Sequence, residues 1–146
     1  MTRIAIEDIW PLSPLQEGML FHAAVESEGS DAYVGQRTLE LTGPVDAARL
    51  RTTWQALLQR HAVLRAGFRR RKSGEAVQVV ARGVVLPWRE VDVSGLGLAD
   101  AVVAAEGVAE EELARGFDVG VPPLVRVALV RLSAVRHWLV ITSHHI

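Results

Sequence analysis

The end of the chain constrains the fold most, because it holds two apolar segments in tandem. Residues 124–132 are nearly continuous in Val, Leu and Ala, and residues 137–146 have the same character beyond a turn at residues 133–135. Segments of this kind are typical of strands that are covered on both faces. We therefore expect the two to pair as an antiparallel hairpin in the interior of a sheet.

The rest of the chain alternates between helical and extended patterns. Helices are predicted from Ser13 onward, where Ser-Pro-Leu-Gln is typical of a helix start, and over residues 46–61 and 99–115. Strands are predicted over residues 33–41, in a hairpin of residues 64–68 with 77–79, and at a sheet edge within residues 84–93, which Pro87 interrupts. This order predicts one α+β domain with helices packed on a mixed, largely antiparallel sheet.

The charge balance excludes partners that depend on a strong overall field. The 146 residues include 16 Lys and Arg against 17 Asp and Glu, so we expect neither nucleic acid nor a membrane as a partner. Because cysteine is absent, disulfides and cysteine-based zinc sites are excluded, and a cytoplasmic location is expected. The one basic run, residues 69–72, is predicted to be a solvated hairpin tip, with a docking patch for an acidic partner as the alternative.

Two adjacent histidines, His144 and His145, stand at the end of the last predicted strand. Successive strand residues point to opposite faces, so the two rings cannot share a metal ion as neighbours. The other histidines show no ligand spacing, and we expect no metal site. From this pattern alone, a structural role for the pair is favoured over a catalytic one.

Three short motifs carry a resemblance to a known family. They are SPLQEGMLFH at residues 13–22, RHAVLRAGF at residues 60–68 and SHHI at residues 143–146, and IEDIWPL at residues 6–12 leads into the first. In order and spacing they resemble the core motifs of condensation domains from nonribosomal peptide synthetases. The resemblance implies the chloramphenicol-acetyltransferase-like fold, in which two related lobes enclose a tunnel, with residues 1–146 as the N-terminal lobe.

The third motif is incomplete in this chain. Its full form in the family is two histidines, three variable residues, Asp and Gly, whereas the sequence stops at Ile146 on a strand that should lie in the core. We therefore expect a truncation that removes the C-terminal lobe, and a fragment that is inactive alone. The missing Asp is a structural group that pairs, in the family, with the arginine matching Arg65. Arg65 is accordingly expected to lose its charge-assisted partner.

The resemblance implies an enzyme that joins a donor acyl or peptidyl thioester to the amine of an aminoacyl thioester. Both substrates would be carried on the phosphopantetheine of peptidyl carrier domains, upstream and downstream, so no cofactor is expected to bind the chain directly. The C-terminal lobe and an adenylation domain are the other expected partners. An α-amine has an unperturbed pKa of roughly 7.7–8, and a histidine pKa near ~6.5 suits the removal of its proton. His145, the second histidine of the motif, is predicted to be catalytic, as a base or by orienting the amine and stabilising the tetrahedral intermediate.

The other motif residues are predicted to support the structure. His144 is expected to pack on the face opposite the catalytic residue. His61 is expected to close the second helix next to Arg60. Ser13 and Gln16 are expected to cap the first helix, and not to act as a nucleophile and its partner, because no base lies nearby in sequence.

Two alternatives remain open at this point. One is a coenzyme A-dependent acyltransferase of the same fold, and the other is a non-catalytic carrier-binding or degenerate domain. Gly18 stands where many family members have an arginine, and the first motif is similar to that of members whose donor ends in a D-residue. We therefore expect a donor that ends in a D-residue, whereas the motifs do not specify the two amino acids that are joined.

Overall fold

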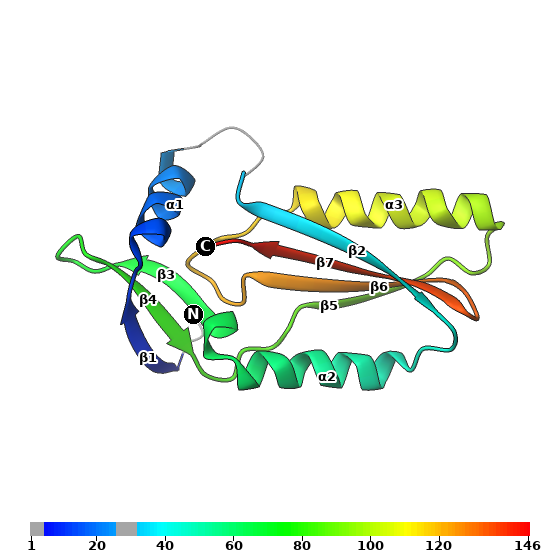
Figure 1. Cartoon of the computed structure of the whole chain (residues 1–146), viewed down its shortest axis with the longest axis horizontal. Coiled ribbons are helices and arrows are strands. Elements are labelled where there is room, and N and C mark those ends of the chain that lie inside the picture. The colour runs from blue at the N-terminus through cyan, green and yellow to red at the C-terminus, as the bar shows by residue number, and fades with distance from the viewer. Residues whose placement is uncertain (1–4, 26–31) are drawn as a thin grey trace.

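The computed structural model describes residues 5–25 and 32–146, and these form two β-sheets and three α-helices (Figure 1). The elements in chain order are β1 (Ile6–Pro11), α1 (Pro14–Val25), β2 (Val34–Thr42), α2 (Ala47–Arg60), the short 3-10 helix η1 (Ala62–Arg65), β3 (Ala66–Arg70), β4 (Ala76–Ala81), β5 (Trp88–Asp92), α3 (Leu98–Ala114), β6 (Val125–Ser133) and β7 (Arg136–His144). No helix within these described ranges is long and apolar enough to cross a membrane.

The larger sheet has the strand order β2-β7-β6-β5. Strand β7 pairs antiparallel with β2 along its whole length, from Arg136 opposite Thr42 to His144 opposite Val34. On its other side β7 pairs antiparallel with β6, which confirms the predicted hairpin in the sheet interior. Because both edges of β7 are hydrogen-bonded, the position of its backbone is fixed up to the end of the strand.

The side chains of the larger sheet alternate between two apolar cores. Leu129 and Leu139 pack in one core with Leu58 of α2, which is 1% exposed. Val140 packs in the other core with Ala105 of α3. Helices α2 and α3 therefore cover opposite faces of the sheet, as Figure 1 shows, and this explains why the central strands are apolar on both sides.

The smaller sheet has the strand order β1-β4-β3. Strands β3 and β4 form the predicted hairpin, and residues 69–72 at its tip are exposed, as expected for a solvated basic turn. Strand β1 pairs antiparallel with β4 and was not predicted. Its side chains are exposed except for the half-buried Trp10, so no alternation of apolar residues marks it in the sequence.

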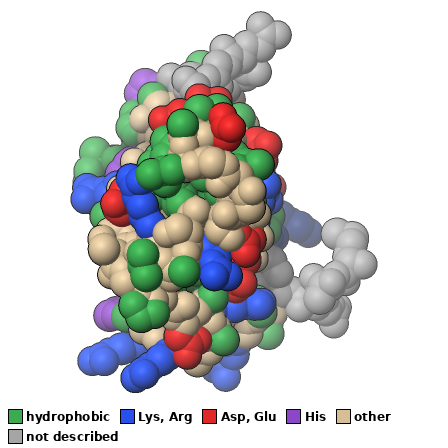
Figure 2. All heavy atoms as spheres, turned by 90° about the vertical axis from the view of Figure 1, so that its right-hand side faces the viewer, with side chains coloured by type: hydrophobic (Ala, Val, Ile, Leu, Met, Phe, Trp, Pro, Cys, Tyr) green, Lys and Arg blue, Asp and Glu red, His purple; other side chains and the backbone are tan. Residues whose placement is uncertain are grey.

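The other predicted helices and strands are confirmed, and the α+β class is confirmed with them. The exception is the start of the hairpin, where Leu64 and Arg65 lie in η1 and not in a strand. Within residues 84–93, only β5 is a strand, and it lies at the edge of the larger sheet as the interruption by Pro87 predicted. Strand β5 pairs parallel with β6 and is connected to it through α3. At the end of the molecule that carries the β6–β7 turn, acidic and basic side chains are interspersed (Figure 2).

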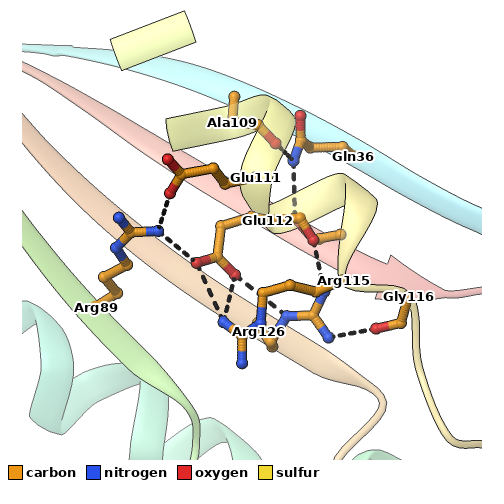
Figure 3. Close-up of polar contacts among 9 residues, drawn as sticks. Gln36, Arg89, Ala109, Glu111, Glu112, Arg115, Gly116 and Arg126 are labelled. Atoms are coloured by element: carbon orange, nitrogen blue, oxygen red, sulfur yellow. Dashed lines mark hydrogen bonds and ion pairs between the residues drawn. The ribbon is translucent and has the colours of Figure 1, made fainter. Parts of the chain in front are cut away.

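A buried glutamate ties α3 to the larger sheet (Figure 3). Glu112 is 3% exposed, and its carboxylate accepts hydrogen bonds at 3.2 Å from Arg126 of β6, Arg89 of β5 and Arg115. Arg126 also donates to the carbonyls of Glu112 and Gly116, at 2.6 Å each. A buried carboxylate is stable only when it is paired in this way, so these residues form a clamp between the helix and two strands.

Glu112→Ala should lower the free energy of unfolding by about 3 kcal/mol or more, because Arg126 is left buried without its charged partner. Chemical denaturation of the chain measures this loss. The matched control is Glu111→Ala, which removes a carboxylate that is 63% exposed and also binds Arg89. The control should cost less than about 1 kcal/mol. Equal losses for the two variants would contradict the clamp.

Candidate functional site at the end of strand β7

The two adjacent histidines lie where β7 ends. The His144 N–H donates to the Leu124 carbonyl at 3.0 Å on one side of the strand, and the His145 N–H donates to the Tyr33 carbonyl at 2.9 Å on the other. The backbone is therefore held on both sides at the last residue of the strand, and on the Tyr33 side one residue beyond it. This placement fixes where each imidazole can point.

An apolar pocket of about 310 Å³ lies beside this end of β7. Its lining comes from the segment of η1 and β3, through Leu64 and Phe68, and from β7, through Ile141, Ser143 and His144. The pocket thus lies between the two sheets. A largely apolar lining with few polar groups is typical of sites that bind the hydrocarbon parts of a small molecule.

His144 is the buried member of the pair. It is 7% exposed and lines the apolar pocket. Its Nδ1 accepts a hydrogen bond from the Ile146 N–H at 3.1 Å, and its ring centroid lies 6.2 Å from that of Tyr33. These contacts bury the ring at the end of β7, and the packing role of His144 stays a prediction.

His145 is exposed, and its ring lies over the backbone of Gly35 in β2. Gly35 pairs with Ser143, and a Cβ added at Gly35 would collide with His145 Nε2. Glycine is therefore required at this position for the imidazole to lie where it does. The described residues that line the apolar pocket include His144 and not His145. The catalytic role of His145 stays a prediction.

The expectation that Arg65 lacks a charged partner is wrong. Arg65 is 5% exposed, and its guanidinium pairs with both carboxylate oxygens of Glu7 in β1, with 3.3 Å between Nη2 and Oε1. It also donates to the carbonyls of Leu58 at 3.1 Å and Ala81 at 2.9 Å. The pairing with Glu7 could not be predicted, because Glu7 lies 58 residues from Arg65 in a segment without a strand pattern. Arg65 therefore joins β1, β4 and the end of α2.

Ser13 and Gln16 form the predicted helix cap. The Gln16 N–H donates to Ser13 Oγ at 3.2 Å, and the Ser13 N–H donates to Gln16 Oε1 at 2.9 Å. This is a capping box, which satisfies two backbone donors at the start of α1. Gln78 of β4 donates to the same Oε1 at 3.0 Å, so the cap also fixes α1 on the smaller sheet.

Arg60 and His61 lie at the end of α2 and are exposed. The His61 N–H donates to the Leu57 carbonyl at 3.0 Å, which closes the helix as predicted. Among the described residues, Val63 and Leu64 line the apolar pocket, whereas Arg60 and His61 do not. No group of three or more His, Cys, Asp or Glu side chains within residues 5–25 and 32–146 is arranged to hold a metal ion.

Comparison with known proteins gives one consistent answer. The family model described as "Condensation domain" matches residues 6–146. The chain is 37% identical over 141 residues to one of the subunits of linear gramicidin synthase from Brevibacillus parabrevis, covering 97% of this chain and 2% of that protein. It is 33% identical over 141 residues to bacitracin synthase 1 from Bacillus licheniformis, covering 97% of this chain and 3% of that protein. The solved structure of the first condensation domain of the calcium-dependent antibiotic synthetase, in complex with a substrate analogue, matches with a TM-score of 0.84 and 23% identity, over 96% of this chain and 33% of that chain.

The chain belongs to the condensation domain family, because the family model matches almost its whole length. Its similarity to the solved condensation domain shows that the fold is the same and confirms the fold that the motifs implied. The chain spans 33% of that solved chain and only 2–3% of the two synthetases that it resembles. The first of these relatives is named as a synthase of linear gramicidin and the second as a synthase of bacitracin.

Gly35→Ala should move the His145 ring without unfolding the protein. The added Cβ meets the far end of an exposed side chain, which can rotate away, so the free energy of unfolding should change by less than about 1 kcal/mol. The NMR signals of the His145 ring should shift. Gly95→Ala is the control, because a Cβ there meets nothing within 4 Å. Unshifted His145 signals in Gly35→Ala would show that the ring does not lie over Gly35.

The Glu7–Arg65 pair should make stability depend on pH in the acid range. The hydrogen bond from Arg65 lowers the pKa of Glu7 from its usual 4.5, so the pair stabilises the folded state above that pH. The contribution is lost as the pH falls through the lowered pKa of Glu7. Glu7→Gln should therefore lower the urea midpoint at pH 7, and the difference from wild type should shrink towards about pH 3.

The matched control for this pH series is Glu75→Gln. The Glu75–Arg71 ion pair is exposed, with side-chain exposures of 59% and 50%, so solvent screens it. This variant should change the urea midpoint little at either pH. A difference between Glu7→Gln and wild type that is as large in acid as at pH 7 would contradict the role of the charged pair.

Proposed function

We propose that the chain, residues 1–146, is the N-terminal lobe of a condensation domain that forms peptide bonds in nonribosomal peptide synthesis. The donor is an acyl or peptidyl thioester, the acceptor is an aminoacyl thioester, and carrier domains present both on phosphopantetheine. Family membership and the identity to linear gramicidin synthase support this proposal. The observation that carries it is the exposed His145, which follows a strand bonded on both edges. Its neighbours in sequence, His144 and Ile146, line the apolar pocket.

The reaction requires one proton transfer. The acceptor amine attacks the carbonyl carbon of the donor thioester, and the tetrahedral intermediate then expels the thiolate of the donor arm. The amine nitrogen loses one proton as it becomes an amide nitrogen, and the thiolate gains one. His145 takes the proton from nitrogen and returns it to sulfur, or it holds the amine in position during the attack. An imidazole at the surface, on a backbone that the sheet holds still, can do either without rearrangement of the strand.

The C-terminal lobe of the same domain is the proposed cover for this site. Helix α1 exposes Leu15 by 69%, Phe21 by 59% and Val25 by 60%, and Val63 beside the pocket is 66% exposed. Apolar side chains that are exposed to this extent favour contact with another part of the protein. The chain alone supplies one wall of the site, so we propose that it does not catalyse condensation without the other lobe.

The proposed partners follow from the reaction. Upstream and downstream peptidyl carrier domains deliver the two thioesters, and an adenylation domain in the parent protein activates the amino acid. The phosphopantetheine arms belong to the carriers, so this chain binds no cofactor of its own. Arg65, with Glu7, is proposed to support the site by holding the smaller sheet, and His144 is proposed to support it by packing at the end of β7.

The complete domain should lose condensation when His145 is replaced. In His145→Ala, the single-turnover rate of amide formation between two loaded carrier domains should fall about 10²-fold or more, because the transition state loses its proton acceptor. Mass spectrometry of the acceptor carrier measures the product. His61→Ala, which removes another exposed histidine at the end of α2, should react at the wild-type rate.

The same assay separates the alternatives. A His145→Ala domain that reacts at the wild-type rate would show that this histidine has no part in the chemistry. Equal rates from acyl-coenzyme A and from the donor carrier would indicate a coenzyme A-dependent acyltransferase. A complete wild-type domain that binds both loaded carriers and forms no amide would indicate a non-catalytic binding domain.

A further inference from the structure

Strand β2 and the residue before it provide the contacts that place His145. The His145 N–H donates to the Tyr33 carbonyl at 2.9 Å, and the His145 ring lies over Gly35. Strand β2 lies at the edge of the larger sheet, where it is bonded to β7 alone among the described strands. The position of the imidazole therefore depends on how firmly this end of β2 is held.

Gln36, the residue after Gly35, links this end of β2 to its neighbours (Figure 3). Its Nε2 donates to the Ala109 carbonyl of α3 at 2.7 Å and to Thr142 Oγ1 of β7 at 3.0 Å. The amide group has two N–H hydrogens, one for each of these acceptors. Gln36 and Thr142 are also partners in the strand ladder, next to the pair of Gly35 and Ser143. One amide group thus joins an edge strand, a central strand and a helix.

The link lies in an otherwise apolar layer between α3 and the sheet. Thr142 is 1% exposed, and Ala109 packs against the core that contains Ala105 and Val140. Hydrogen bonds in such surroundings give a modest net stability, because the same groups bind water in the unfolded chain. They do impose a distance and a direction, and apolar contacts do not. The link therefore specifies the position of β2 more than it stabilises the fold.

We propose that Gln36 is a positioning residue for His145, an inference that rests on the proposed function. Its amide group holds β2 against β7 and α3, so that Gly35 stays beneath the imidazole and Tyr33 stays within reach of the His145 N–H. Successive strand residues point to opposite faces, so the Gln36 side chain lies on the face away from the His145 ring. Gln36 acts through the backbone of β2 and does not contact the reacting groups.

NMR spectroscopy of the chain tests the position of the ring. Nuclear Overhauser cross-peaks between the His145 ring protons and the Gly35 Hα protons are expected in the wild type. They should be lost in Gln36→Leu, which keeps a side chain of similar size and removes the amide. Thr142→Val removes the acceptor hydroxyl and keeps the shape, so it should weaken the cross-peaks. Thr142→Ser keeps the hydroxyl and should retain them.

Gln55→Leu is the matched control. Gln55 is also half-buried, and its side-chain amide donates to the Val84 carbonyl at 3.0 Å and accepts from the Leu86 N–H at 2.8 Å. It joins α2 to the segment between β4 and β5, which does not contain β2 or β7. Both glutamine variants should lower the urea midpoint, because each loses hydrogen bonds of a half-buried amide. Only Gln36→Leu should lose the cross-peaks.

The rate of the complete domain tests the consequence for catalysis. In Gln36→Leu, the single-turnover rate of amide formation between two loaded carriers should fall about tenfold, because a displaced imidazole meets the amine in the wrong geometry. The affinity for the loaded acceptor carrier should not change. Gln55→Leu should react at the wild-type rate once circular dichroism shows that it is folded, since a loss of stability alone does not slow the folded protein.

The outcomes distinguish this inference from the proposed function. Retained cross-peaks in Gln36→Leu would overturn the positioning role. A wild-type rate in Gln36→Leu beside a lost rate in His145→Ala would overturn it too, as would equal rate losses in Gln36→Leu and Gln55→Leu. A wild-type rate in His145→Ala would instead contradict the proposed function, and the cross-peaks would still decide whether Gln36 holds the ring in place.

Discussion

The position of the histidine pair depends on β7 being bonded along both edges. Strand β2 lies on one side and β6 on the other, and helices cover both faces of the sheet. A shift of one residue in this register would turn every side chain of β7 to the opposite face. The imidazole of His145 would then take the buried position that His144 holds. Apolar residues with no chemistry of their own therefore decide which histidine is exposed.

Arg65 has a similar role for the smaller sheet. With 5% of its surface exposed, it is held by the Glu7 carboxylate and by the carbonyls of Leu58 and Ala81. Buried charge is tolerated when it is paired and hydrogen-bonded. Arg65 is paired with Glu7, and each of its three guanidinium nitrogens donates at least one hydrogen bond. Arg65 ends η1 and directly precedes β3, so it also fixes the segment that forms one wall of the apolar pocket.

The sequence predicted the helices and strands whose apolar residues recur at a regular spacing because they face a core. Strands β6 and β7 and helix α2 were predictable because their apolar residues face a core, and the capping box of Ser13 and Gln16 was predictable because it is local. Strand β1 was not predictable, because its side chains are largely exposed. The Glu112 clamp and the Glu7–Arg65 pair each join segments that are distant in sequence, and no local pattern records such pairings. The requirement for glycine at position 35 could not be predicted for the same reason. The His145 ring, which belongs to the segment after β7, occupies the space that a Cβ at Gly35 would need.

The assignment of the catalytic histidine depends on where an acceptor amine lies relative to the two imidazoles. A crystal structure of the complete domain, bound to an acceptor carrier with a non-reactive aminoacyl arm, measures this directly. The amine nitrogen should lie within about 3.2 Å of a ring nitrogen of His145, or be joined to it through one water. An amine bound against His144 in the apolar pocket, or held out of reach of both rings, would contradict the assignment.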